Sequence, residues 1–264
     1  MRIRELVVVA AALFAAHATP AAAQRSGDRA RLVFTVSGAY IQGRGLWAVP
    51  SQPVQDAPFI DNFALARRIN PTFGASFSGA YFPGEHVGLS ADFVLLGLGY
   101  DDSCRLAGPA QSTRNAEVCA DIDGQEKSAA AVTVSTGANF RFFSRDFISP
   151  FARVNAGLLF SNQSSVLTQG ISASNAGALL TIFEDEKRTR VSPALALGVG
   201  ATMPIGRAYH LRWEVRDNIV GIEAVTGPTA APRFVPPHER RYKHLFSFLI
   251  GIDIILERNR GRRY

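Results

Sequence analysis

The feature that most restricts the fold of this chain is the alternation of apolar residues with small or polar ones. The alternation recurs in eight separate stretches, and its period is always two residues. Successive side chains of a β-strand point to opposite faces of a sheet, so this period is typical of strands whose two faces meet different surroundings. The pattern predicts eight strands, at residues 32–40, 72–82, 87–100, 129–143, 149–161, 191–203, 209–217 and 242–256.

The connections between these predicted strands alternate between long and short. In chain order they are residues 48–69, 83–85, 101–127, 144–146, 162–187, 204–206 and 221–241. Short turns at one end and long loops at the other are typical of an eight-stranded antiparallel up-and-down transmembrane β-barrel. Both termini then lie on the side of the turns. No linker-like stretch separates two cores, so the sequence predicts a single all-β domain.

Alternation alone does not tell which face of a barrel points outward, because a soluble lipocalin-like barrel turns its apolar face inward. The lysines favour a lipid-facing exterior. Only three of the 28 basic residues are lysines, and Lys127, Lys187 and Lys243 all lie at edges of predicted strands rather than inside them. A soluble β-protein covers its outward faces with Lys and Glu. The polar face also consists largely of Gly, Ala, Ser and Thr, which fit a narrow lumen.

Aromatic residues near the ends of the predicted strands favour the same reading. Trp47, Tyr100 and Tyr242 lie towards the loops, and a second set lies towards the turns. That second set is Tyr81, Phe147, Phe151 and Tyr209. Aromatic girdles of this kind mark the two membrane interfaces, where an amphipathic ring has both apolar and wet neighbours.

The first residues are typical of a secretory signal peptide. Arg2 and Arg4 precede a short apolar core, and Ala21 to Ala23 form a small-residue cleavage site. We therefore divide the chain into a signal peptide, residues 1–23, and a barrel domain, residues 24–264. The barrel domain carries four long surface loops and a short basic C-terminal tail. The net charge of +6 is dispersed, and an exported chain does not meet genomic DNA, so nucleic acid is not an expected partner.

The polar face of the predicted strands carries charged and amide side chains that would point into the lumen. They are Asp92, Asn139, Arg141, Arg153, Asn155, His210, Arg212, Glu214, Arg216 and Asp253. Charges inside a narrow barrel must be paired or hydrated, because isolated charges are costly to bury. We expect a structural network that plugs the lumen. A narrow pore for ions or small solutes is the alternative.

A third possibility is an enzyme that modifies lipids of the outer leaflet, which would need a nucleophile beside a histidine base. His86 and His210 lie near the predicted turns, the wrong end for such chemistry. His244 lies near the outer rim, but the sequence shows no accompanying set of serine and carboxylate. We assign no catalytic residues, no cofactor and no metal. The segment Asp121 to Gly124 lacks the rest of a calcium-binding loop.

The long connections contain two further features. Cys104 and Cys119 are the only cysteines, and in an oxidising compartment they are expected to form a disulfide within the loop 101–127. We interpret that acidic loop as a solvated surface loop. Residues 61–69 and 177–187 are candidates for short helices.

The chain resembles the small outer-membrane barrels of the OmpA- and OmpX-like type, in the outer membrane protein β-barrel domain family. The resemblance is carried by Gly198-Val199-Gly200, by Pro204-Ile205-Gly206 and by the run 211–217, and its architecture covers essentially all of the mature sequence. It implies a bacterial outer-membrane location, contact with membrane lipids and lipopolysaccharide, and a structural, adhesive or envelope-interaction role. A surface ligand is possible, but its identity does not follow.

The last predicted strand resembles the signal recognised by the barrel-assembly machinery. Gly251, Ile254 and Leu256 match its glycine and two later apolar positions, which implies that machinery as a partner. Leu249 departs from the pattern because that position is usually polar, and the terminal aromatic Tyr264 lies beyond a basic tail. A helix is the alternative for this stretch, but the central glycine and the neighbouring isoleucines favour a strand.

Overall fold

The computed structural model describes residues 29–56, 58–143, 147–161, 164–173, 177–185, 190–206, 208–229 and 234–259. The expected signal peptide, the turn at 144–146, Lys187 and the last residues of the basic tail lie outside the described residues. Within the described residues, no helix is long and apolar enough to cross a membrane.

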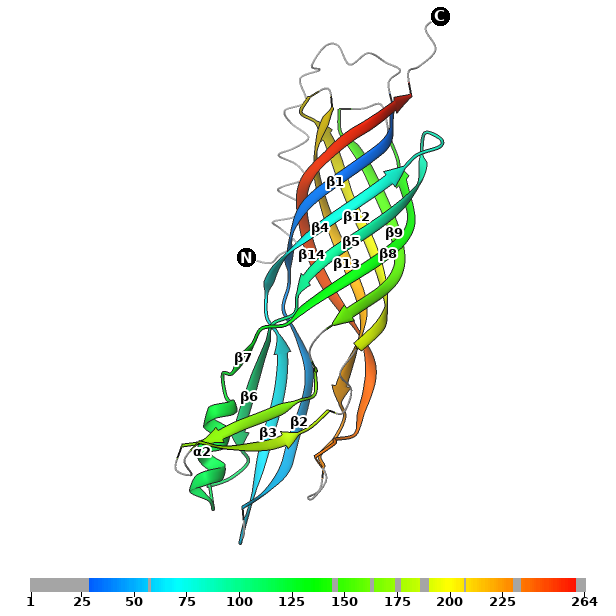
Figure 1. Ribbon diagram of the computed structural model, residues 1–264. Coiled ribbons are helices and arrows are strands. Elements are labelled where there is room, and N and C mark those ends of the chain that lie inside the picture. The colour runs from blue at the N-terminus through cyan, green and yellow to red at the C-terminus, as the bar shows by residue number, and fades with distance from the viewer. Residues whose placement is uncertain are drawn as a thin grey trace, which may run out of the picture.

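Eight antiparallel strands close into a barrel, which confirms the predicted fold (Figure 1). In order around the wall they are β1 (Arg29–Ile41), β14 (His238–Asn259), β13 (Tyr209–Val225), β12 (Arg190–Pro204), β9 (Ser149–Ser161), β8 (Ala130–Arg141), β5 (Val87–Gly97) and β4 (Thr72–Tyr81). The first and last strands complete the ring by pairing with each other, with Val36 opposite Ile252. A closed ring leaves no strand edge unpaired, which is what a sheet in lipid requires.

The alternation of the sequence becomes an inside and an outside in the barrel wall. On β5, Leu89 and Phe93 are 66% and 42% exposed, whereas Ser90 and Asp92 between them are buried. The same holds for the other strands, so large apolar side chains cover the outer wall. Among them are Phe34, Val36, Phe77, Leu95, Val134, Val154, Leu158, Leu195, Leu197, Val199, Trp213, Val215, Phe246, Phe248, Ile250 and Ile252. An exposed apolar belt of this extent is suited to lipid and not to water.

The long connections are not simple loops, because most of them fold into a second body beyond one end of the barrel (Figure 1). A four-stranded sheet has the order β2 (Arg44–Asp56), β3 (Phe59–Ile69), β6 (Tyr100–Leu106) and β7 (Glu126–Lys127). Beside it lie the helix α2 (Thr113–Ile122) and the hairpin β10 (Thr168–Ser172) to β11 (Ala178–Phe183). We call this body the surface domain.

Both helices considered for the long connections are wrong. Residues 61–69 lie in β3, where Phe63, Leu65 and Arg67 are buried and alternate with more exposed neighbours. Residues 178–183 form β11. The helix that does form, α2, lies in the connection interpreted as a solvated loop. Its residues Val118 and Ile122 are buried, so that interpretation is also wrong.

Several strands extend past the boundaries expected from their alternation. The β13–β14 hairpin continues from the barrel to the pairing of Val225 with His238. Lys243 therefore lies inside β14, so the expectation that no lysine falls inside a strand is wrong for this residue, whereas Lys127 is the last residue of the two-residue strand β7. These segments continue beyond the lipid-facing part of the wall, where a lysine carries no cost of burial in lipid.

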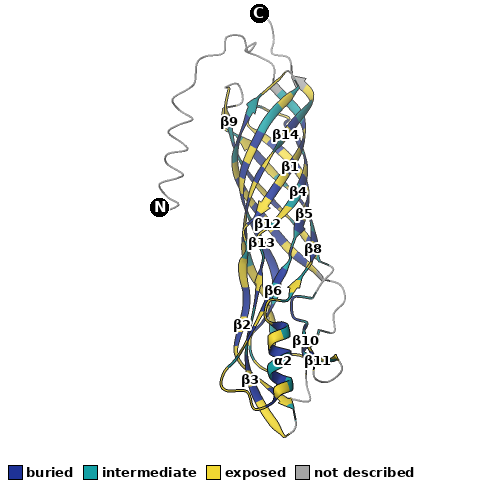
Figure 2. Ribbon diagram, turned by 90° about the vertical axis from the view of Figure 1, so that its left-hand side faces the viewer, coloured by how far each residue is buried: buried dark blue, intermediate teal, exposed yellow. Residues whose placement is uncertain are grey.

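One apolar core joins the outer half of the lumen, the half at the loop end of the barrel, to the surface domain. Ile41, Leu96 and Leu159 from barrel strands belong to the same buried cluster as Phe63 and Phe183 from the surface domain. Figure 2 shows buried residues along the whole length of both bodies. The barrel mouth and the surface domain are thus packed against each other, and neither is an independent layer.

This packing corrects three assignments to the aromatic girdles. Trp47 and Tyr100 are 7% and 2% exposed and belong to the core of the surface domain, because they lie on β2 and β6 of its four-stranded sheet. Phe151 is 3% exposed and points into the lumen. Tyr242 is exposed at the loop end, and the remaining ring residues are exposed at the turn end. These are Tyr81, Phe147 and Tyr209.

Candidate functional site

The inner half of the lumen, towards the turns, contains a network of charged side chains centred on Glu214 of β13. Arg216 Nε and Arg212 Nη2 lie 2.7 and 2.9 Å from its carboxylate oxygens, and Arg153 Nη1 lies 3.4 Å away. Glu214, Arg153 and Arg216 are almost fully buried. Residues 212, 214 and 216 alternate along one strand, which is why all three point inward together. Gly198 on β12 leaves room for this carboxylate, because a Cβ there would lie 2.4 Å from Glu214 Oε1.

A second carboxylate, Asp92 of β5, joins this network from the opposite wall. It contacts the guanidinium of Arg153, accepts a hydrogen bond from Asn155 Nδ2 at 2.7 Å, and lies 3.6 Å from Arg216 Nη1. Ser90 donates to Asn155 Oδ1 at 2.8 Å. Asp92 and Glu214 therefore share their arginines, and the charges form one connected group across the lumen rather than separate pairs.

Closer to the turns, Asp253 of β14 accepts a hydrogen bond from Thr35 at 2.7 Å and lies 3.7 Å from Arg212 Nη1. Arg212 also stacks over the Phe151 ring, with its Cζ 4.0 Å from the centroid. The guanidinium thus has an anion on one side and an aromatic face on the other, both of which stabilise a cation away from water.

The three remaining candidates of the lumen set lie nearest the turns. Arg141 donates to Ala30 O at 2.8 Å and stacks on the Phe82 ring. Asn139 is buried, and His210 is half-buried opposite Asp253 in the β13–β14 register. The polar residues chosen from the sequence therefore occupy the inner half of the barrel.

The outer half of the lumen is largely apolar, which the sequence did not predict, and its buried polar side chains, such as Asn218 and Thr133, are uncharged. Val94, Leu96, Leu159 and Val220 are all buried there and belong to the apolar cluster at the barrel mouth. Each lies an even number of residues from a lumen-facing polar residue on the same strand, so its side chain points into the lumen as well. Among the described residues, the charged network is therefore separated from the loop end of the barrel by packed apolar side chains.

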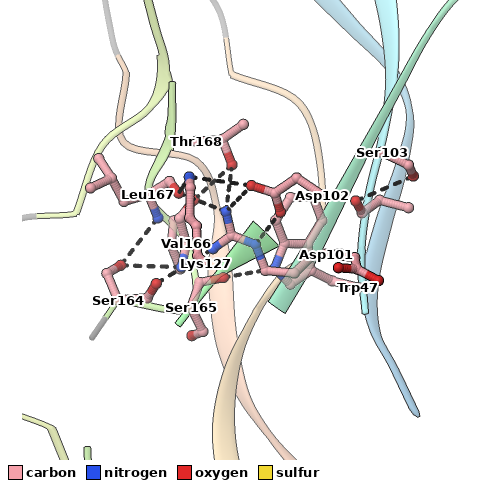
Figure 3. Close-up of polar contacts among 12 residues, drawn as sticks. Trp47, Asp101, Asp102, Ser103, Lys127, Ser164, Ser165, Val166, Leu167 and Thr168 are labelled. Atoms are coloured by element: carbon pink, nitrogen blue, oxygen red, sulfur yellow. Dashed lines mark hydrogen bonds and ion pairs between the residues drawn. The ribbon is translucent and has the colours of Figure 1, made fainter. Parts of the chain in front are cut away.

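The surface domain has a buried ion pair of its own, between Arg67 of β3 and Asp102 of β6. Figure 3 shows Asp102 together with Lys127, Leu167 and Thr168, which surround this pair. Arg67 Nε and Nη2 lie 2.5 and 2.7 Å from the two carboxylate oxygens of Asp102. Arg67 Nη2 also donates to Leu167 O at 2.7 Å, and the guanidinium faces the rings of Trp47 and Tyr100. This contact set, the Arg67 clasp, joins three of the long connections.

Lys127 of β7 completes the clasp, with its Nζ 3.3 Å from Asp102 and 3.3 Å from Leu167 O. Burial lowers the pKa of Lys127; Asp102 opposes this shift, and Arg67 adds to it. Trp47 Nε1 donates to Ser165 O at 2.8 Å, so the indole also holds the third long connection. The sequence analysis missed the clasp. Arg67 alternates with Phe63 and Leu65, so in a strand it lies on the same apolar face, and this spacing could have indicated a buried arginine.

The acidic connection is held by covalent and polar contacts. Cys104 and Cys119 form a disulfide with their Cα atoms 5.3 Å apart, which confirms the predicted bond and ties β6 to α2. Asp61 accepts hydrogen bonds from the main-chain N–H groups of Gln111 and Ser112 at 2.8 and 3.1 Å, at the start of α2. Burial would raise the pKa of Asp61, but these bonds and one from Asn115 together lower it.

Two acidic side chains of the segment 121–124 accept hydrogen bonds within the surface domain. Asp121 accepts hydrogen bonds from Gln125 Nε2 and from Ile171 N, each at 2.8 Å. Asp123 accepts one from Cys104 N at 3.3 Å. These carboxylates connect α2 to its neighbours in the surface domain.

His244 has a carboxylate partner that the sequence did not reveal. Its Nδ1 lies 2.7 Å from Asp217 Oδ2 on the adjacent strand. In the part of the chain that the structure describes, no serine, threonine or cysteine is hydrogen-bonded to His244. His86 lies at the turn end, where its Nδ1 is 2.8 Å from Arg141 O.

Comparison with known proteins places this architecture among solved outer-membrane barrels. Neither a protein-family model nor a curated protein sequence matches the chain. The outer membrane protein OprG from Pseudomonas aeruginosa is similar at a TM-score of 0.50 and 9% identity, over 89% of this chain and 97% of that one. At such identity the likeness shows a shared fold.

Two further solved structures align over most of the chain. Neisserial surface protein A aligns at a TM-score of 0.41 and 9% identity, over 87% of this chain and 99% of that one. The outer membrane protein AlkL, solved in DMPC lipid bilayers, aligns at 0.42 and 14% identity, over 93% and 96%. With its closed eight-stranded ring, its apolar outer wall and the fold it shares with OprG, this chain has the fold of the small β-barrel proteins of the bacterial outer membrane.

Proposed function

We propose that this protein is a non-conducting outer-membrane barrel that displays its surface domain outside the cell for an adhesive or envelope-contact role. The observation that carries the proposal is the single apolar core that fills the barrel mouth and continues into the surface domain. A pore would need a polar path along the barrel axis. The charged network and the apolar residues above it support a plug instead.

The surface domain supports a contact role because its most distant part carries apolar side chains. The β2–β3 hairpin extends furthest from the barrel (Figure 1). Near its tip, Phe59 and Ile60 are 44% and 51% exposed. Exposed aromatic and aliphatic side chains on a rigid hairpin are a common feature of protein contact surfaces. The disulfide and the Arg67 clasp supply the rigidity.

We assign no catalytic activity to the protein. His244 and Asp217 form a pair suited to a base, but acyl transfer also needs a nucleophile within hydrogen-bond reach. The contacts of His244 supply none among the described residues.

Single-channel recording tests the plug. Purified protein inserted in planar bilayers should give no stepwise conductance. Protein of the same preparation should show the heat-dependent gel mobility of a folded barrel, so that an absence of conductance is not due to misfolding. Reproducible conductance steps from such folded protein would replace the plug by the narrow pore.

Cell adhesion tests the contact role. Cells that display the protein should aggregate, or be retained on protein-coated wells, more than cells with the empty vector. The double substitution Phe59→Ser/Ile60→Ser should reverse the gain. The matched control is Ile171→Ser/Leu179→Ser, because these residues of the β10–β11 hairpin are similarly exposed, at 45% and 56%. No gain over the empty vector, or equal loss in both variants, would contradict a contact site at the hairpin tip.

Export and assembly follow the sequence features in this proposal. The signal peptide is removed after Ala23, and the barrel-assembly machinery inserts the mature chain by its last strand. N-terminal sequencing of the membrane-inserted protein should begin at Gln24. An N-terminus at Met1 would refute the cleavage site.

A further inference from the structure

The third long connection covers the barrel mouth without joining another sheet. Among the described residues, β10 and β11 pair only with each other, and Figure 2 shows them beside α2. We call residues 164–173 and 177–185 the mouth segment. Its Val166 and Phe183 are buried in the cluster that also contains Leu159 of the barrel mouth. The segment therefore closes the core over the mouth, although no ladder of the described strands binds it to the rest of the protein.

Side chains from the four-stranded sheet hold the main chain of this segment. Trp47 Nε1 donates to Ser165 O at 2.8 Å. Arg67 Nη2 and Lys127 Nζ both donate to Leu167 O, at 2.7 and 3.3 Å. Each of these bonds joins a side chain of the sheet to a main-chain carbonyl of the segment. They can therefore break without separating any strands of the sheet.

The bonds between the mouth segment and α2 also use side chains. Asp121 of the helix accepts a hydrogen bond from Ile171 N at 2.8 Å, and Glu117 accepts one from Ser172 Oγ at 3.0 Å. The disulfide and the start of α2 are held by β6 and by Asp61, not by the mouth segment. The helix can therefore stay in place when the segment moves away.

Two further bonds attach the mouth segment to the β13–β14 hairpin and to the connection that joins its strands. Ser165 Oγ donates to Glu223 O at 2.7 Å. Glu184 N donates to Phe234 O at 2.8 Å, and this is the one main-chain hydrogen bond between the segment and another part of the described chain. Side chains thus provide nearly all of the polar contacts that hold the segment.

Asp102 of β6 keeps two of the donors together. Its carboxylate pairs with Arg67 and lies 3.3 Å from Lys127 Nζ, and both cations share Leu167 O as an acceptor. Burial lowers the pKa of Lys127 most, the charge of Asp102 raises it, and the charge of Arg67 lowers it again. Without the carboxylate, the two cations would face each other at a largely buried place, which is strongly unfavourable. The hold on Leu167 therefore depends on Asp102.

We propose that the mouth segment is a lid that opens as one unit, and that Asp102, acting through Arg67 and Lys127, is its latch. Proteins open locally in cooperative units that often coincide with supersecondary motifs, such as this hairpin. Opening uncovers Leu159 and its apolar neighbours, whereas the charged network around Glu214 stays in place. The surface domain then has two states, which differ in whether the apolar mouth is covered. This device goes beyond the proposed function and requires neither adhesion nor conductance.

Hydrogen exchange of the full protein in detergent micelles, measured by mass spectrometry, tests the lid. The test variant is Asp102→Asn, which keeps the shape of the side chain and removes its charge. The matched control is Asp101→Asn on the same strand, because the side chain of Asp101 accepts hydrogen bonds from Arg68 and Asn70 and not from the mouth segment. Heat-dependent gel mobility verifies that each variant is folded.

Asp102→Asn should speed amide exchange in β10 and β11 by the same factor, at least about tenfold, because loss of one partner from a buried ion pair is strongly destabilising. A two-stranded hairpin is marginally stable by itself, so its amides exchange once it leaves the core. Amides of β3 and β6 should keep their wild-type rates. In Asp101→Asn, the rates in β10 and β11 should also stay at the wild-type level.

A second readout follows the barrel mouth itself. Both native cysteines are joined in the disulfide, so Leu159→Cys introduces a single free thiol at a site that is 3% exposed. This thiol should react with a water-soluble maleimide about tenfold faster when Asp102→Asn is also present, in step with the faster exchange of the hairpin. Asp101→Asn should leave its reaction rate unchanged.

Four results would overturn the lid. An equal rise of exchange in β3 and β6 would show that Asp102 holds the whole surface domain together. Unchanged exchange in β10 and β11 would show that Asp102 is no latch, and an equal effect of Asp101→Asn would show that only net charge matters. Faster exchange with an unreactive thiol at position 159 would mean that the hairpin frays while the mouth stays covered. None of these results would affect the plug or the contact role.

Discussion

Arginine is the residue that organises both buried polar centres of this protein. Arg153, Arg212 and Arg216 converge on Glu214 in the lumen, and Arg67 holds Asp102 in the surface domain. A guanidinium offers several donors in one plane, so one arginine serves two acceptors and can stack on an aromatic ring as well. Such groups are stable only as a complete set, because removal of one partner leaves an uncompensated buried charge.

The lumen network predicts the effect of Glu214→Ala. The substitution leaves three arginines short of a carboxylate, and it should lower the free energy of unfolding by about 3–5 kcal/mol if the lumen is dry. Leu211→Ala, on the lipid side of the same strand, should cost less. Urea unfolding in detergent, followed by gel mobility, measures both. Unchanged stability combined with new ion conductance in Glu214→Ala would mean that the lumen is wet, and the plug would give way to the pore.

Asp61 predicts a pH dependence at the start of α2. Its pKa is lowered in the folded state, so its contribution to stability is complete above the unfolded pKa of about 3.9 and is lost as pH falls through the lower folded value. Hydrogen exchange at the Gln111 and Ser112 amides, corrected for intrinsic rates, should show protection at pH 5 that declines below pH 4. Asp61→Asn should remove this dependence. An identical profile in that variant would show that another group is responsible.

At the scale of the element, the curvature of the wall depends on where strands approach closely. Gly251 of β14 lies on the seam that closes the barrel, opposite Ser37 of β1. A Cβ at this glycine would lie 2.2 Å from Val36 O and 2.2 Å from Ser37 Oγ. Only a residue without a side chain fits a main chain that passes so near. Gly251, which matches the glycine of the assembly signal, is thus also required by the close approach of β1 to β14.

This seam predicts that Gly251→Ala lowers stability by about 1–3 kcal/mol, the usual cost of overpacking. Gly38 is the matched control, because a Cβ at that position of β1 meets nothing within 4 Å. Gly38→Ala should therefore change stability little. Urea midpoints of the two variants in the same detergent provide the measurement, and equal midpoints would contradict the steric account.

The disulfide acts on an element rather than on the barrel. Cys104 and Cys119 are separated by 15 residues, and closing such a loop contributes about 3 kcal/mol in the chain-entropy model. In Cys104→Ser/Cys119→Ser, trypsin should cut after Arg114 in α2 far faster than in the wild type. The heat-dependent mobility of the barrel should not change, and its loss would show that the bond supports the whole fold.

At the scale of the whole molecule, the barrel and the surface domain share one core. Leu96 and Leu159 in the barrel mouth and Val118 in the surface domain belong to one buried cluster. The long connections are therefore ordered because the mouth of the barrel is apolar and needs a cover. In the proposed function, the residues that anchor this cover also close the lumen.

The orientation of the molecule predicts where a tag is accessible. An epitope inserted after Gly108, in the exposed segment between β6 and α2, should be labelled by antibody on intact cells. The same epitope after Gly84, in the β4–β5 turn, should be labelled only after the outer membrane is opened. Labelling of Gly84 and not Gly108 on intact cells would invert the orientation.

The sequence by itself determined the barrel and the number of strands in its wall, because both follow from the two-residue period of a strand. The disulfide also followed, since only one pairing of Cys104 with Cys119 is possible. All of these are local or pairwise properties. They therefore do not depend on which segments of the chain become neighbours in the folded protein.

Only the tertiary structure decided what fills the outer lumen and what the long connections become. Residues 61–69 form a strand rather than a helix because β2 and β6 lie on either side of them. Trp47 and Tyr100 are buried against Arg67, which lies on the strand between theirs, and Arg67 meets Asp102 only when β3 and β6 pair. Burial depends on contacts between segments far apart in the chain, and a local period carries no information about which segments those are.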